Sequence, residues 1–138
     1  MSQDLLTVEV WSDGSGTTGD RDSGFGVVVK YPNKPPVCIG EYLGKGTNNT
    51  AELTALYRAL DAIPDGYNAT VYSDSQYAIG CATQPWTPKK NIELVQKLRA
   101  KYLSLQDRVT IQHVYGHSGV PENEMADQLA NYGRKKVL

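Results

Sequence analysis

Alternating hydrophobic and polar positions dominate the first third of the chain and predict three β-strands. In residues 6–12, Leu6, Val8 and Val10 fall on one face, with the two-residue period of a half-buried strand. Two further β-rich runs, at 24–31 and 37–43, are separated by the turn residues PNKPP. Such short connections favour an antiparallel meander.

From Asn49 onward the hydrophobic spacing becomes helical. Leu53, Leu56, Tyr57 and Leu60 form one helical stripe, which ends at the sequence PDG. The pattern then predicts a strand at 69–73, a helix at 75–81, a helix at 91–105, a strand at 109–115 and a helix at 121–136. The predicted buried positions of the two long helices are Ile92, Val95, Leu98 and Leu105, then Met125, Leu129 and Tyr132. This order indicates a mixed sheet with packed helices, its later parallel strands joined by right-handed crossovers.

Composition narrows the class of protein. A chain of 138 residues with 40% hydrophobic residues fits one compact domain. It has neither a signal-peptide pattern at its start nor an apolar run long enough to cross a bilayer, so we expect a soluble, cytoplasmic protein. Cys38 and Cys81 lack metal-site spacing and are interpreted as reduced packing residues rather than a disulfide.

Charge limits how the protein can hold a polyanion. The formal net charge is -1, which argues against tight, unaided binding of nucleic acid through phosphate contacts. Local clusters of basic residues occur at 89–90, 97–101 and 134–136.

Two aspartates follow predicted strands. Asp13 comes directly after the first strand, in SDGSG, and Asp74 after the strand at 69–73, in YSDSQY. A turn aspartate and a helix N-cap are the simpler interpretations of the two. These strands are expected to be neighbours in the sheet centre, however, so Asp13 and Asp74 would emerge side by side.

Two more acids lie on predicted helices. Glu52, in TNNTAEL, could complete a capping box with Asn49 as N-cap. Glu122 and Glu124 are explained by the dipole of the last helix, but Asp127 lies beyond its first turn. The helix carrying Glu52 would pack across the sheet, and the last helix can bring Asp127 to the sheet edge.

Four carboxylates held together repel unless protons or cations neutralise them. Mg²⁺ prefers oxygen ligands and commonly completes its shell with substrate phosphate. Two such ions ~4 Å apart can activate a water and stabilise the leaving oxygen of a phosphoryl displacement.

Four motifs carry a resemblance to a known family. SDGSG, TNNTAEL, YSDSQY and GHSGVPENEMADQLA, in this order, resemble the signature blocks of the type 1 ribonucleases H over residues 8–133. The resemblance implies a single ribonuclease H domain at 1–138. It also implies an α/β ribonuclease H-like fold, with a five-stranded mixed sheet of an antiparallel meander plus two parallel strands and helices on both faces.

The resemblance also implies an activity. It is metal-dependent endonucleolytic cleavage of the RNA strand of RNA/DNA hybrids, leaving 5′-phosphate and 3′-hydroxyl ends. Two Mg²⁺ ions, with Mn²⁺ as a substitute, would be the cofactors. By position, Asp13, Glu52 and Asp74 would hold one ion, and Asp13 and Asp127 the other.

His117 lies in a glycine-containing loop, between Gly116 and Gly119. A histidine titrates near neutrality, with an unperturbed pKa of ~6.5. The resemblance implies an assisting role in proton transfer or product release; a polar loop histidine is the alternative. His113, within a predicted strand, is interpreted as structural.

Polar residues beside the acids are candidate substrate contacts. Asn48 and Asn49 offer donors and acceptors suited to a minor groove, and Gln76 is either another groove contact or a solvated side chain. The resemblance places these three in the minor groove of the hybrid, where 2′-hydroxyl groups mark RNA. It also implies that Thr47 and Asn91 seat a phosphate of the DNA strand.

The chain departs from many relatives between its short helix and Asn91. The stretch CATQPWTPKKN replaces an extra helix and a basic protrusion; Trp86, Lys89 and Lys90 are either its remnant or, for Trp86, a cap on the core. Gly16 and Gly19 stand where some relatives present polar or thiol side chains.

These differences predict weak, salt-sensitive binding assisted by a polymerase or reverse transcriptase partner. We expect a monomer with no membrane partner.

Two rival functions remain open at this level. A non-catalytic binding module would keep the fold, but the acids would hinder its binding of a polyanion. A nuclease or integrase acting on DNA is the other alternative, against which the paired asparagines and the histidine loop favour the hybrid.

Overall fold

The protein is described by a computed structural model in which residues 6–17 and 21–138 are defined; Gly19 lies outside them. The strands are β1 (Thr7–Gly16), β2 (Asp22–Lys30), β3 (Val37–Lys45), β4 (Asn68–Ser73) and β5 (Val109–His113). The helices are α1 (Asn48–Asp61), α2 (Gln76–Thr83), α3 (Ile92–Leu105) and α4 (Pro121–Arg134), with a 3₁₀ turn η2 (Gln106–Arg108) before β5.

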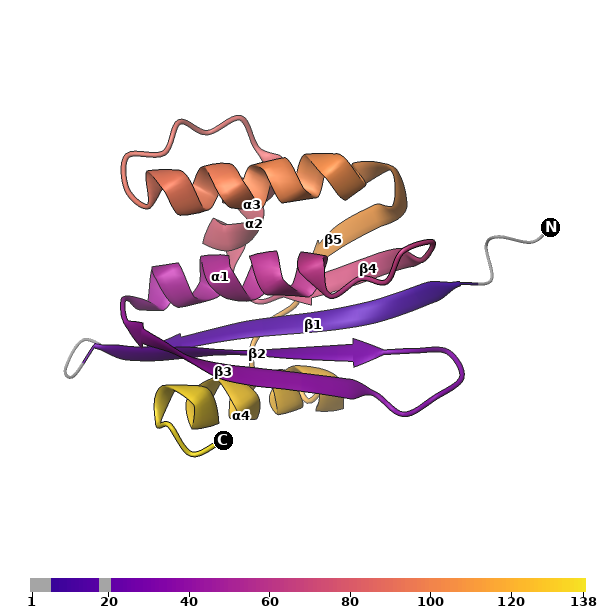
Figure 1. Ribbon diagram of the computed structural model, residues 1–138, viewed down its shortest axis with the longest axis horizontal. Coiled ribbons are helices and arrows are strands. Elements are labelled where there is room, and N and C mark those ends of the chain that lie inside the picture. The colour runs from indigo at the N-terminus through magenta and orange to yellow at the C-terminus, as the bar shows by residue number, and fades with distance from the viewer. Residues whose placement is uncertain (1–5, 18–20) are drawn as a thin grey trace.

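The strands form one sheet in the order β3-β2-β1-β4-β5. β1, β2 and β3 pair antiparallel, whereas β1 with β4 and β4 with β5 pair parallel. In Figure 1, α1, α2 and α3 lie on one side of the sheet and α4 on the other. The expected five-stranded mixed sheet with helices on both faces is therefore confirmed.

The main core lies between the sheet and α1. Leu53, Leu56 and Leu60 are buried there, as the helical spacing predicts, and Tyr57 packs at the margin. On α3, Val95 and Leu98 join this core, but Ile92 is 48% exposed. The prediction for Ile92 was wrong because this first residue of the helix lies outside the part of α3 that packs on the core.

The opposite face is covered by α4 through small residues. Ala126, Ala130 and Gly133 are buried, while Met125 and Tyr132 are 37% and 43% exposed. The predicted buried side of this helix was therefore wrong for the two large residues. The reason is that the helix backbone lies against glycines of the sheet, which leaves no depth for long side chains.

Gly26 shows how close this approach is. A Cβ at position 26 would overlap the Ala126 carbonyl oxygen and lie 2.7 Å from the Leu129 Cβ. Leu129 lies at the edge of this contact, packed on a small cluster of Trp11, Val28 and Ala126.

Some boundaries also differ from the sequence pattern. β1 continues through Asp13 to Gly16, because β2 pairs with it well beyond the end of β4. Asp13 therefore lies within a strand, not after one. β5 ends at His113 rather than at 115, and α4 at Arg134 rather than at 136.

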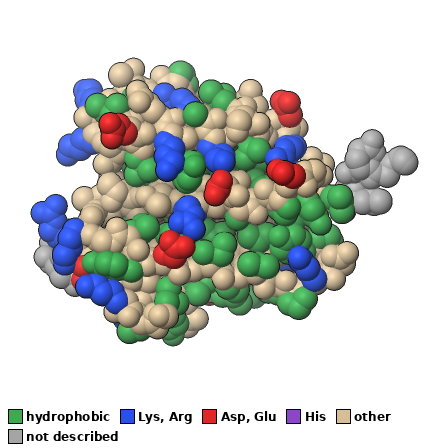
Figure 2. Space-filling model, viewed as in Figure 1, with side chains coloured by type: hydrophobic (Ala, Val, Ile, Leu, Met, Phe, Trp, Pro, Cys, Tyr) green, Lys and Arg blue, Asp and Glu red, His purple; other side chains and the backbone are tan. Residues whose placement is uncertain are grey.

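The surface is of mixed charge. On the face in Figure 2, Lys and Arg side chains lie among Asp and Glu rather than forming one continuous basic surface, as the net charge of -1 suggests. Cys38 is exposed and Cys81 buried, and both are free thiols. Among the described residues, no helix combines the length and hydropathy that spanning a membrane requires.

Candidate active site

Strand register brings Asp13 and Asp74 together. β1 and β4 run parallel, and their last pair is Ser12 with Ser73. The next residue of each chain segment is an aspartate, so both carboxylates leave the same end of the β1–β4 pair. The expectation that the two emerge side by side is confirmed: carboxylate oxygens of Asp13, Glu52 and Asp74 all lie within 4.8 Å of one another.

Glu52 reaches this point from α1. The Gly14 amide donates a hydrogen bond to the Glu52 Oε1 at 3.0 Å. Position 14 has no space for a side chain, because a Cβ there would overlap the backbone of Ala51. Helix α1 therefore packs directly on β1. Its buried Glu52 carboxylate extends toward Asp13 and Asp74.

The capping role that Glu52 could have had is excluded. Thr47, not Asn49, is the N-cap of α1: its hydroxyl accepts the Thr50 amide at 3.1 Å, and the Thr50 hydroxyl accepts the Thr47 amide at 2.9 Å. A threonine pair thus satisfies the helix start, and Glu52 is left for the acid cluster.

Asp74 is likewise not a cap. Ser75 is the N-cap of α2, and its hydroxyl accepts the Ala78 amide at 3.0 Å. The Oδ1 of Asp74 is buried without a hydrogen-bond partner among the described residues. Gly116 lies against the other oxygen, since a Cβ there would be 2.9 Å from Oδ2. A carboxylate oxygen in this state is suited to bind a cation.

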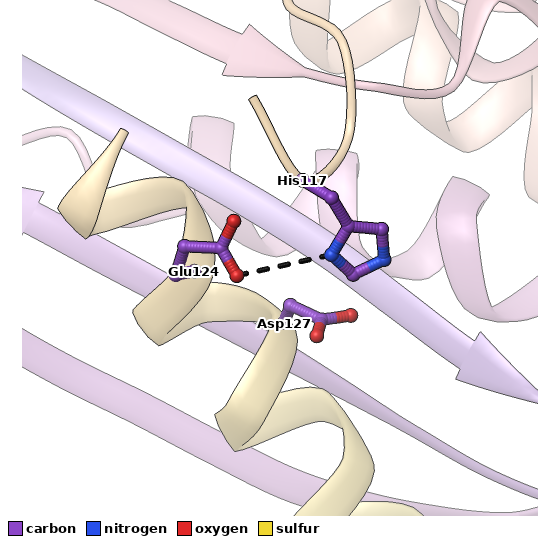
Figure 3. Close-up of side chains that lie close together, drawn as sticks. All are labelled: His117, Glu124 and Asp127. Carbon is purple, nitrogen blue, oxygen red and sulfur yellow. Dashed lines mark ion pairs between the residues drawn. The ribbon is translucent and has the colours of Figure 1, made fainter. Parts of the chain in front are cut away.

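Asp127 belongs to two groups of side chains. It lies close enough to Asp13 to help raise the pKa of that carboxyl, and it also lies with His117 and Glu124 in a cluster whose ligand atoms are within 4.8 Å of one another. Figure 3 shows these three side chains converging from α4 and from the loop before it. The His117 Nδ1 lies 3.8 Å from the Glu124 Oε1.

Sequence reasoning missed the part that Glu124 plays. It assigned this residue to the helix dipole alone, although positions 124 and 127 are three apart and share one helix face. That spacing was the available signal. His117 itself is exposed, with a φ of 58°, a conformation that few residues other than glycine adopt.

The acid cluster is electrostatically costly. Burial, followed by the charges of Glu52 and Asp74, raises the pKa of Asp13 to about 10. Burial and the charge of Asp74 raise the pKa of Glu52 to about 8, although the Gly14 amide opposes this. Each shift means that the ionised form is disfavoured where it stands.

This donor set fits a divalent cation. Four carboxylates supply hard oxygen ligands, one oxygen has no partner, and two of the groups resist ionisation unless a positive charge joins them. A metal ion would give the Asp74 oxygen a partner and would favour the ionised forms of Asp13 and Glu52.

The candidate substrate residues lie at the starts of three helices. Thr47, Asn48, Asn49 and Gln76 are exposed at the starts of α1 and α2. Asn91 has a left-handed backbone conformation before α3, and its Nδ2 donates to the Tyr77 hydroxyl at 3.3 Å. The Thr47 hydroxyl already caps α1, so a phosphate would share it with the Thr50 amide.

Comparisons with known proteins find a matching family and similar chains. The RNase H family model matches residues 6–135. The ribonuclease H of Hahella chejuensis (strain KCTC 2396) is 35% identical over an alignment of 147 positions. The alignment covers 97% of this chain and 97% of that one.

Two solved structures are also similar. RNase H1 from the halophilic archaeon Halobacterium salinarum NRC-1 is 27% identical, with a TM-score of 0.72, over 94% of this chain and 98% of that one. LC11-RNase H1, solved in complex with an RNA/DNA hybrid, has the same fold at 22% identity and a TM-score of 0.74, over 94% and 97% of the two chains.

Proposed function

The chain belongs to the ribonuclease H family, and from that premise we propose that it hydrolyses the RNA strand of RNA/DNA hybrids internally, leaving 5′-phosphate and 3′-hydroxyl ends. The observation that carries the proposal is the buried acid cluster: Asp13, Glu52 and Asp74 meet within 4.8 Å at the edge of β1, and Asp127 joins them from α4. No structural role accounts for so many charges there.

Divalent metal ions are the proposed cofactors, as is general in this family. Asp13, Glu52 and Asp74 would hold one Mg²⁺, and Asp13 and Asp127 a second, with Mn²⁺ as a substitute. When bound, such a pair supplies Lewis acidity to the attacked phosphate and favours ionisation of the attacking water. The side chains of the protein supply the remaining functions.

His117 is proposed as the proton-transfer residue. Its ring is exposed next to Asp127, so it can reach a substrate oxygen and exchange a proton with solvent. Glu124 limits the positions of this ring through its contact with Nδ1. The loop conformation, with Gly116 against Asp74 and Gly119 at a φ of 93°, places the ring at the rim of the acids.

The substrate would lie across the starts of α1 and α2. Asn48, Asn49 and Gln76 are exposed there and would contact the minor groove of the hybrid, while Thr47 and Asn91 would seat a phosphate of the DNA strand. The hybrid bound by LC11-RNase H1, which has the same fold, supports this choice of substrate.

Affinity is expected to be modest. The net charge of -1 and the absence of a basic protrusion leave few phosphate contacts, so we propose that a polymerase or reverse transcriptase supplies part of the binding. The chain itself would act as one domain and as a monomer.

One assay tests the proposal against its rivals. The purified protein is incubated with labelled RNA/DNA hybrid, RNA duplex and DNA duplex, each with Mg²⁺ and with chelator. Loss of the RNA strand from the hybrid alone, and only with metal, is expected. Retention of the hybrid without cleavage would indicate a binding module, and cleavage of the DNA duplex would indicate a DNA nuclease.

A further inference from the structure

The segment 84–91, which joins α2 to α3, is fixed by one arginine. Arg99 of α3 donates from Nε to the Cys81 carbonyl at 3.2 Å and from a terminal nitrogen to the Trp86 carbonyl at 2.8 Å. The first acceptor lies in the last turn of α2 and the second lies within the segment. A single guanidinium therefore holds the segment to the end of α2, where a cation is also favoured by the helix dipole.

Trp86 is fixed a second time, by Gly80. The benzo edge of its indole occupies the place where a side chain at position 80 would begin, since a Cβ there would overlap Cη2 and Cζ3. Trp86 is nevertheless 49% exposed. A large ring is thus held in one position while much of it faces outward, which is unusual for a side chain that serves only the core.

The fixed segment forms one side of a cavity of about 300 Å³. The cavity is lined by aromatic, cationic and amide side chains, among them Tyr77, Trp86, Lys89, Lys90, Asn49 and Asn91. The last two are also proposed substrate contacts. The cavity is therefore continuous with the surface on which the hybrid would lie.

We propose that Arg99 and Gly80 are positioning residues that hold the segment 84–91 as a preformed wall for the uncut DNA strand of the hybrid. The aromatic side chains offer flat apolar area to sugars, and Lys89 and Lys90 offer charge to phosphates. Because the segment 84–91 is already ordered in the free protein, substrate binding loses no affinity to ordering it. A free loop of the same length would have that cost. This inference rests on the proposed function.

The first test compares four proteins in steady-state cleavage of the hybrid: the unchanged chain, Arg99→Gln, Arg99→Lys and the control Lys97→Gln. Lys97 lies on the same helix and its ammonium stacks over Tyr57, so its loss removes one charge without releasing the segment. Arg99→Gln is expected to raise KM roughly tenfold with kcat within twofold. Arg99→Lys keeps the charge but not the paired hydrogen bonds to the Cys81 and Trp86 carbonyls. Its KM should therefore lie between those of the parent and of Arg99→Gln.

A second variant tests Gly80, the other residue that holds the segment 84–91. Gly80→Ala leaves every charge in place but displaces the Trp86 ring, and the same rise in KM is expected. Trp86 is the exposed one of two tryptophans, Trp11 being buried, so acrylamide quenching of fluorescence reports the displacement without substrate. Circular dichroism checks that both variants fold.

The outcomes separate the inference from the function on which it rests. Unchanged KM in Arg99→Gln and Gly80→Ala, with increased quenching and normal cleavage by the parent protein, overturns the positioning role and leaves the nuclease proposal intact. An equal rise in Lys97→Gln also overturns it, because charge alone would then explain the effect. A parent protein that does not cleave the hybrid overturns both.

Discussion

Among the side chains that the structure describes, Asp13 carries the largest electrostatic cost, because it is buried next to Glu52, Asp74 and Asp127. Asp13→Asn removes the ligand proposed to be shared by both metal ions and is expected to abolish turnover. In chelator at pH 8 the same change should stabilise the fold by roughly 1–3 kcal/mol, because the folded state no longer has to take up a proton that the unfolded chain releases at this pH. Hybrid cleavage and thermal unfolding measure the two effects.

Asp107→Asn is the matched control, since Asp107 is exposed in the turn before β5. It should leave both activity and melting temperature unchanged. Near-normal cleavage by Asp13→Asn would show that the metal site has been assigned to the wrong residues.

His117 gives a second prediction at this scale. His117→Ala should lower kcat about 10²-fold while KM stays within a few-fold, because general acid–base catalysis contributes about this much. Glu124→Gln should lower kcat less, since it affects only the orientation of the ring. A larger loss in Glu124→Gln than in His117→Ala would instead make Glu124 a direct participant.

Sequence reasoning located the acids better than their surroundings. Asp13 and Asp74 were identifiable because both follow regular strand patterns. The helix caps were not, because asparagine, aspartate and the hydroxyl residues Thr47 and Ser75 all suit an N-cap, and only the folded geometry decides among neighbours.

At the scale of elements, the contact of α4 with the sheet decides where Asp127 lies. Gly26 pairs with Asp13 across β1 and β2, and opposite residues of an antiparallel pair face the same side. Gly26→Ala would push α4 away from the sheet. We expect a loss of about 2–3 kcal/mol in unfolding free energy, together with reduced activity as Asp127 moves from Asp13.

Gly44→Ala separates crowding from backbone strain. Gly44 has a φ of 83° and open space at the Cβ position, so this change should cost only about 1 kcal/mol and leave cleavage intact. Urea unfolding of both variants measures the difference. Equal losses in the two would mean that close packing of α4 contributes nothing.

The same contact explains why the buried side of α4 could not be predicted. Hydrophobic spacing selected Met125 and Tyr132, because large apolar residues normally face a core. Here the sheet presents glycine, so the helix approaches on Ala126 and Ala130 instead. The element itself, its proline start and its place in the order of the fold were all predictable.

For the molecule as a whole, stability should depend on pH in a direction set by the acids. The pKa values of Glu52 and Asp13 are raised to about 8 and about 10, so the folded state binds protons that the unfolded state has released above about pH 5. Between about pH 5 and pH 10, the free energy of unfolding in chelator is therefore greatest at pH 5 and falls as the pH rises through 8 toward 10.

Added Mg²⁺ or Mn²⁺ should reverse the fall, because a cation replaces the protons. Thermal unfolding at pH 5, 7 and 9, with and without metal, measures this. A melting temperature that is flat across the series, or indifferent to metal, would mean that the acids are not strained. Asp107→Asn should behave as the parent does.

A last consequence follows from α4 being the one described helix on its face of the sheet (Figure 1). The larger core, between the sheet and α1, does not depend on it. Partial opening that releases this helix alone therefore has a lower free energy than global unfolding. Detachment would carry away Asp127 and Glu124 and separate them from Asp13, so the partly opened protein would be folded but inactive, and a metal ion held by both Asp13 and Asp127 would disfavour that opening.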